Sequence, residues 1–147
     1  MIAIGCDHGG FELAKKIMEH FDKNGIEYKN FGTYGGEAVD YPDIALPLSK
    51  SVAQGECIKG ILVCGTGIGM SMAANKVKGI RAAVCTDHFS VKFTRLHNNA
   101  NVLCLGGRVL GDLFALELVD IFLNTEYEGG RHQNRLDKIA AIEEENE

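Results

Sequence analysis

Short apolar runs alternate along this chain with longer stretches in which apolar residues recur every three or four positions. The runs predict five buried strands, over residues 2–6, 28–31, 60–64, 80–85 and 102–105. Residues 60–64 are apolar on both faces of the expected strand. Because such strands occur in sheets covered by helices on both sides, this run indicates a parallel sheet.

The longer stretches predict helices between these strands. Phe11, Ile17 and Phe21 belong to one face of a helix that Asn24-Gly25 ends. Further helices are expected over 43–54, where Asp43 caps the start and Pro47 distorts an early turn, from the following glycine loop through 76, over 89–97 and over 113–123. The order predicts a doubly wound, Rossmann-like α/β fold, a five-stranded parallel sheet with helices on both faces.

The tail differs from the rest of the chain. Residues 131–147 predict a helix with few apolar residues, namely Leu136, Ile139, Ala140, Ala141 and Ile142. A helix with so narrow an apolar stripe needs another surface to cover it, either on its own subunit or on a neighbouring one. We expect one domain over residues 1–147, with 131–147 as a C-terminal helical extension that packs on a partner subunit.

Composition excludes several classes of protein. The 147 residues are 46% hydrophobic and 24% charged, as in folded globular proteins, and the net charge of -5 argues against a general nucleic-acid or anionic-membrane binder. The five cysteines are odd in number and widely spaced, so they predict neither a disulfide framework nor a zinc site. With no leader segment or membrane-spanning run, we expect a cytoplasmic protein without membrane or nucleic-acid partners.

Two unusual segments follow strands, where ligands bind in parallel sheets. Residues 7–10 follow the first strand and residues 64–69 follow the third. The second segment lacks the ending of a nucleotide P-loop, and Met70 stands where a dinucleotide fingerprint needs glycine, although Asp87 keeps that alternative open. Its glycines leave main-chain N–H groups accessible to a phosphate or an oxyanion, but they would equally suit a tight turn without a ligand.

Cys64 ends the third strand directly before this glycine loop. A helix N-terminus lowers the pKa of a thiol, so Cys64 is a candidate base. Cysteine is also a frequent core residue, and composition by itself favours that role. We interpret Cys6, Cys85 and Cys104, at comparable strand positions, as core.

Histidine and arginine supply the other candidate groups. His97 precedes two asparagines, a setting in which an imidazole exchanges protons while amides orient hydroxyls. Arg108 follows the last strand, and Arg131 and Arg135 share one helix face because they are four residues apart. Two guanidinium groups on one face suit a phosphate, although solvated or salt-bridged surface arginines would show the same spacing.

Taken together, these segments resemble type B ribose-5-phosphate isomerases, a family that also includes allose-6-phosphate and galactose-6-phosphate isomerases. The resemblance covers nearly the whole chain in order. It is carried by the segments at 5–11 (GCDHGGF), 40–43 (DYPD), 64–69 (CGTGIG), 73–76 (AANK), 97–101 (HNNAN) and 129–135 (GGRHQNR).

The resemblance implies an aldose–ketose isomerase that interconverts ribose 5-phosphate and ribulose 5-phosphate without a metal or organic cofactor. Cys64 matches the base, and His97 the residue that assists ring opening, with Thr66 as a helper. Some members carry a glutamate at the place of Met70, so this chain belongs to the cysteine type. The positions that match substrate-binding residues are Asp7, His8, Gly65, Gly67, Ile68, Gly69, Asn98, Arg108, Arg131 and Arg135.

Topology adds an expectation about assembly. Cys64 lies at the carboxyl end of its strand, whereas His97 ends a helix and so lies near the opposite edge of the sheet. A five-residue strand spans roughly 17 Å, too far for one side chain to bridge. We therefore predict a homodimer, or a tetramer built from it, in which Cys64 and His8 of one subunit meet His97 and the tail arginines of its partner.

Two alternative functions stay open. One is an isomerase of a six-carbon sugar phosphate, which pocket size around Tyr41, Met70 and Phe89 would decide. The presence of Cys64, His97 and both tail arginines in one chain favours a self-sufficient enzyme over a two-chain galactose-6-phosphate isomerase. The other alternative is a sugar-phosphate or nucleotide sensor that does not need Cys64 for turnover.

Overall fold

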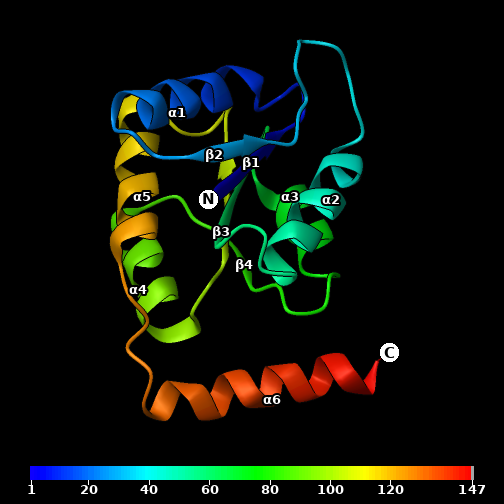
Figure 1. Ribbon diagram of the computed structural model, residues 1–147, viewed down its shortest axis with the longest axis vertical. Helices are drawn as coiled ribbons and strands as arrows, with labels where there is room; N and C mark the ends of the chain where they lie inside the picture. The colour runs from blue at the N-terminus through cyan, green and yellow to red at the C-terminus, as the bar shows by residue number, and fades with distance from the viewer. Residues whose placement is uncertain (147) are drawn as a thin grey trace.

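The computed structural model describes residues 1–146 and contains one parallel five-stranded sheet in the order β2-β1-β3-β5-β4 (Figure 1). The expected doubly wound fold is confirmed. No helix within residues 1–146 combines the length and apolar character needed to cross a bilayer. The elements are β1 (Ile2–Cys6), α1 (Phe11–Lys23), β2 (Tyr28–Asn30), α2 (Tyr41–Ala53), β3 (Lys59–Cys64), α3 (Ile68–Ala74), β4 (Ala82–Val84), α4 (His88–Asn98), β5 (Val102–Gly106), α5 (Asp112–Asn124) and α6 (Arg131–Glu145).

Helices cover both faces of the sheet. Buried side chains of α1, α4 and α5 pack on one face, and those of α2 and α3 pack on the other. Alternate residues of a strand point to opposite faces, so Ile61 and Val63 meet the first group while Leu62 and Cys64 meet the second. The chain leaves β1 toward β2 and leaves β3 toward β4, so the strand order reverses between β1 and β3. This reversal creates the crevice where ligands of doubly wound folds bind.

The start of α2 corrects the sequence prediction. The helix begins at Tyr41 with extended Asp40 as its N-cap, rather than being capped by Asp43. Pro42 is tolerated in the first turn because its missing N–H would have no helical partner there. The helix continues through Pro47 to Ala53.

Helix α6 lies across the edge of the sheet where the strands begin (Figure 1). Its His132 and Leu136 are buried on the helix's own subunit, and the Gly79 N–H donates to Glu143 Oε1 at 2.9 Å. Ile139 and Ile142, in contrast, are more than half exposed and line a groove of about 1000 Å³ between α6 and the body. The helix therefore contacts its own subunit while leaving apolar side chains uncovered. The expected helix over 131–147 ends at Glu145, and residue 147 lies outside the described residues.

Candidate active site

Three loops meet where β1, β3 and β5 end side by side. The Asp7 N–H donates to the Val63 carbonyl at 3.1 Å, so the loop after β1 is held against β3. The Arg108 N–H donates to the Gly65 carbonyl at 3.0 Å, which ties the loop after β5 to the glycine loop. The structure thus brings together the candidate residues that follow these three strands.

Two glycines make this close approach sterically possible. A methyl group at Gly10 would lie 2.3 Å from the Val63 carbonyl oxygen, so no larger residue fits between the loop after β1 and strand β3. Gly67 caps the start of α3 with a φ of +81°, a conformation that side chains with a Cβ rarely adopt. The sharp turn brings the Gly67 N–H onto the side chain of Cys64, at the end of β3.

Cys64 lies inside that turn. Its side chain is 5% exposed, and Sγ accepts the Gly67 N–H at 3.1 Å. The arrangement therefore places a sulfur that can take up a proton beside main-chain donors.

The cysteines interpreted as core are buried, as expected, and all are free thiols. Burial raises the pKa of Cys6 and of Cys85 to about 11, and it raises the pKa of Cys104 as well. These thiols stay protonated at neutral pH, so they are unsuited to serve as a base.

Asp7 and His8 perform different tasks at the end of β1. The Asp7 carboxylate is buried, and its Oδ1 accepts the N–H groups of Gly9 at 2.9 Å and Gly10 at 3.1 Å. This carboxylate therefore shapes the loop. His8 is exposed, and its Nδ1 accepts the Val39 N–H at 3.3 Å, which ties the long 32–40 loop to this edge of the sheet.

The remaining side chains at this edge surround the glycine loop. Thr66 Oγ1 accepts the Ile68 N–H at 3.2 Å, and the Arg108 guanidinium lies beside Gly65. The Tyr41 ring covers Gly69 so closely that a methyl group there would lie 2.7 Å from it. Met70 is fully buried, which contradicts the expectation that it lines a substrate pocket. Its side chain points into the core because it lies on the inner face of α3.

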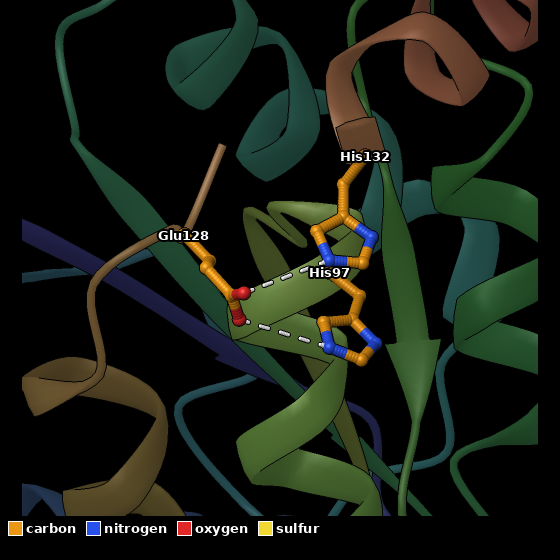
Figure 2. Close-up of side chains that lie close together, drawn as sticks. All are labelled: His97, Glu128 and His132. Carbon is orange, nitrogen blue, oxygen red and sulfur yellow. Dashed lines mark ion pairs between the residues drawn. The ribbon is translucent and has the colours of Figure 1, made fainter. Parts of the chain in front are cut away.

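A second group of candidates lies on α4 and α6, where the strands begin. His97, in the last turn of α4, stacks on His132 of α6 with ring centroids 4.0 Å apart. Its Nε2 lies 3.8 Å from Glu128 Oε2. Figure 2 marks this ion pair with a dashed line. Asn98 follows directly, and its carbonyl accepts Arg81 Nε at 3.2 Å.

The arginines of α6 are both exposed and share one helix face, as expected. Arg135 Nη1 donates to the main-chain carbonyl of Arg131 at 3.0 Å, one helical turn earlier. His132, between them in sequence, is buried. Burial lowers its pKa, and the neighbouring His97 lowers it further. The imidazole of His132 is therefore neutral at physiological pH.

Sequence reasoning did not single out Glu128 and His132. His132 stands inside the segment at 129–135 that contributed the two arginines, and this was the available signal. Glu128 carried none, because its contacts with His97 and His132 arise only when α6 folds back onto the end of α4.

The two groups do not meet within one chain. The Gly60 N–H, at the start of β3, donates to the carbonyl of Asn101, four residues after His97. Cys64, at the other end of β3, pairs with Gly106. The strand from Gly60 to Cys64 spans roughly 13 Å, so His97 and both α6 arginines lie at the opposite edge of the sheet from Cys64.

Comparison with known proteins supplies close relatives. A family model described as Ribose/Galactose Isomerase matches residues 2–139. Ribose-5-phosphate isomerase B of Escherichia coli is 49% identical, over 97% of this chain and 96% of its own length.

Solved structures agree in fold over nearly the full length. The ribose-5-phosphate isomerase B of Clostridium thermocellum superposes with a TM-score of 0.98 at 51% identity and covers 99% of both chains. That of Mycoplasma genitalium, determined with bound ribulose-5-phosphate, gives 0.93 at 43% identity over 98% of this chain and 96% of its own. The chain therefore belongs to the ribose/galactose isomerase family.

Proposed function

We propose that this chain is a type B ribose-5-phosphate isomerase, which interconverts ribose 5-phosphate and ribulose 5-phosphate. One observation carries the proposal, namely the Cys64 sulfur accepting the Gly67 N–H at the mouth of a glycine loop. High identity to enzymes named for this reaction supports the choice of substrate. The buried, free cysteines fit a reducing cytoplasm.

The reaction moves one proton between adjacent carbons of the open-chain sugar. The Cys64 thiolate takes the proton from C2 of the aldose, and the electrons of that C–H bond form a C1–C2 double bond while the carbonyl oxygen becomes negative. The thiol then returns the proton to C1, while the C2 hydroxyl passes its proton to the negative C1 oxygen, so that the ketose carbonyl forms at C2. Backbone N–H groups of the 65–69 loop are suited to stabilise the enediolate oxygen.

Ring opening and substrate binding need the second group of residues. We assign His97 as the group that transfers a proton to and from the ring oxygen, with Thr66 as its helper. Arg131 and Arg135 bind the phosphate through paired, charge-assisted hydrogen bonds. Asp7, His8, Asn98 and Arg108 complete the set around the sugar hydroxyls.

Because Cys64 and His97 lie at opposite edges of one subunit, we propose a homodimer with two composite sites. In a two-fold dimer the edge of one subunit that carries Cys64 faces the partner's edge that carries His97, and the reverse holds at the second site. Exposed apolar side chains support such an interface, since isolated chains rarely leave so many uncovered. They are Ile68, Met72, Val84, Phe89 and Val109 around the Cys64 edge, and Ile139 and Ile142 on α6.

The substrate assignment is tested with purified protein and the 5-phosphate of ribose beside the 6-phosphates of allose and galactose. We expect the highest kcat/KM with ribose 5-phosphate. A higher value with either six-carbon substrate would assign the chain to that branch of the family, and absence of turnover with binding retained would identify a sensor.

The composite site is tested by mixing two inactive variants, Cys64→Ala and His97→Gln. After dissociation and reassociation, half of the dimers contain one chain of each kind, and each of these holds one intact site. The mixture should therefore recover about a quarter of the wild-type activity. No recovery, despite mixed dimers demonstrated by mass spectrometry, would show that both residues act within one chain.

A further inference from the structure

Three side chains from different parts of the chain meet beside α6 (Figure 2). They are His97 of α4, His132 of α6 and Glu128 of the segment between α5 and α6. Each offers one ligand atom, and these atoms all lie within 4.8 Å of one another. Figure 2 shows that one nitrogen of each imidazole ring faces the Glu128 carboxylate.

Within the described residues, the polar atoms of this cluster are not all hydrogen-bonded, as His132 shows. The residue is 7% exposed, and its Nε2 has no hydrogen-bond partner among residues 1–146. The closest carboxylate oxygen, Glu128 Oε1, is 3.9 Å away, beyond hydrogen-bond range. A buried polar atom without a partner destabilises a fold unless something binds it. The Nε2 atom faces Glu128, so an occupant between them would satisfy it.

We propose that His97, Glu128 and His132 form a binding site for a divalent transition metal, with Zn²⁺ as the best fit. Two imidazole nitrogens and one carboxylate oxygen are a donor set that Zn²⁺ accepts, with water in the fourth position. This metal is an inhibitor of the enzyme and takes no part in the isomerisation.

The geometry needs small adjustments to close on an ion. Ligand atoms of a tetrahedral zinc site lie about 3.4 Å apart, given bonds near 2.1 Å. Glu128 Oε2 lies 3.8 Å from His97 Nε2, and Glu128 Oε1 lies 3.9 Å from His132 Nε2. One ligand atom from each residue lies within 4.8 Å of the others, so these atoms must approach one another by up to about 1.4 Å. The two rings are nearly parallel, at 15°, and must rotate so that their lone pairs converge. His97 and Glu128 have the room to move, because both side chains are partly exposed.

The consequence for activity rests on the proposed function. A nitrogen that binds Zn²⁺ has no lone pair left for a proton, so a metal-bound His97 cannot assist ring opening. Zn²⁺ should therefore inhibit the isomerase reversibly, and a chelator should restore its activity.

The test is calorimetric titration of the intact, metal-stripped protein with Zn²⁺, together with the visible spectrum after Co²⁺ is added. We expect one ion per chain and the intense absorption of four-coordinate Co²⁺. Glu128→Gln should weaken binding more than about tenfold, and His132→Asn should do so as well. Because Glu128 is half-exposed, its variant keeps the test valid even if the buried His132 variant fails to fold.

Two controls locate the ion. His88 forms a surface pair with Glu117 at 2.9 Å, so His88→Gln removes a similar histidine from another place and should not change Zn²⁺ affinity. Cys64→Ser removes the reactive thiol and should leave binding intact. If Cys64→Ser abolishes binding while Glu128→Gln does not, the metal lies on the thiol and the proposed site is wrong.

The outcomes also separate this inference from the proposed function. Absence of binding at stoichiometric Zn²⁺ overturns the metal site and leaves the isomerase assignment untouched. Binding that depends on Glu128 but leaves turnover unchanged supports the metal site and overturns the role of His97 in ring opening.

Discussion

The two edges of the sheet carry candidate groups in contrasting ways. At the carboxyl edge, Cys64 and Asp7 are buried, and each accepts main-chain N–H groups from the loop that it shapes. At the opposite edge, His97, Arg131 and Arg135 stand at least partly exposed on the surfaces of α4 and α6. Hydrogen bonds from main-chain groups therefore fix the candidate residues at the carboxyl edge, whereas the candidates at the opposite edge are side chains on helix surfaces.

Because of this difference, we expect substitutions at the two edges to affect stability and activity differently. Changes at the carboxyl edge disturb main-chain hydrogen bonds and close packing, so they affect stability as well as chemistry. Changes among the exposed side chains of α6 leave the core intact and affect only what the helix binds. The four predictions that follow test this contrast, beginning with the largest expected effect.

Cys64→Ala should lower kcat by about 10³-fold while leaving KM within a few-fold, because a positioned base contributes that order of rate. Steady-state kinetics with ribose 5-phosphate measures this. Cys57→Ala is the matched control, since Cys57 is also buried but precedes the start of β3, at the opposite end of that strand from the glycine loop. It should cost stability, about 1–2 kcal/mol, and leave kcat unchanged. Equal losses of kcat in the two variants would contradict the role of Cys64.

Gly10→Ala should destabilise the fold by about 3 kcal/mol, because its methyl group would lie 2.3 Å from the Val63 carbonyl oxygen and would push the loop off β3. Urea unfolding followed by circular dichroism measures the change. Gly35→Ala, where nothing lies within 4 Å, should change the free energy of unfolding by less than about 0.5 kcal/mol. An unchanged free energy of unfolding in Gly10→Ala would show that the loop after β1 can move away from Val63 without loss of stability.

The architecture could be predicted from the sequence because buried apolar residues recur with the spacing of the strand or helix that they belong to. Strands such as β1 and β3 are short apolar runs, and the face of α1 repeats every three or four residues. The start of α2 was predicted wrongly because Asp43 looked like a cap, whereas Asp40 caps the helix and Pro42 fits its first turn. The local pattern allowed both starting points, and packing selected one.

The candidate site was predictable only in part. Groups that directly follow strands, such as Cys64 and Asp7, could be placed at one edge from topology. The contact of His97 with Glu128 and His132 could not be predicted, because it depends on the angle at which α6 crosses the end of α4. Sequence spacing fixes which residues share a helix face, as for Arg131 and Arg135, but not which element that face approaches.

Arg135→Ala should raise KM for ribose 5-phosphate by about tenfold, because it removes one charge-assisted hydrogen bond to the phosphate. The melting temperature should not change, since the side chain is exposed and its one hydrogen bond within residues 1–146 goes to the Arg131 carbonyl of its own helix. Lys138→Ala removes a positive charge from the same helix three residues further on and serves as the control. A similar rise in KM in both variants would indicate a general field effect rather than a phosphate contact.

The smallest expected effect concerns Cys85, a core thiol close to the end of β4. Burial, and secondly the Asp87 carboxylate, raise the pKa of Cys85 from 9.0 to about 11. Between these values the unfolded chain releases a proton that the folded protein retains, so the stability contributed below pH 9 is lost as pH approaches 11. Solvent near the thiol screens part of this loss, and we expect about 1 kcal/mol.

Urea unfolding at pH 8 and pH 10.5 should therefore show a smaller decline in the free energy of unfolding for Cys85→Ala than for the wild type. Lys59, whose pKa burial lowers to about 8, titrates in both proteins and cancels in the comparison. Identical declines would mean that the Cys85 thiol ionises in the folded protein as readily as an exposed one.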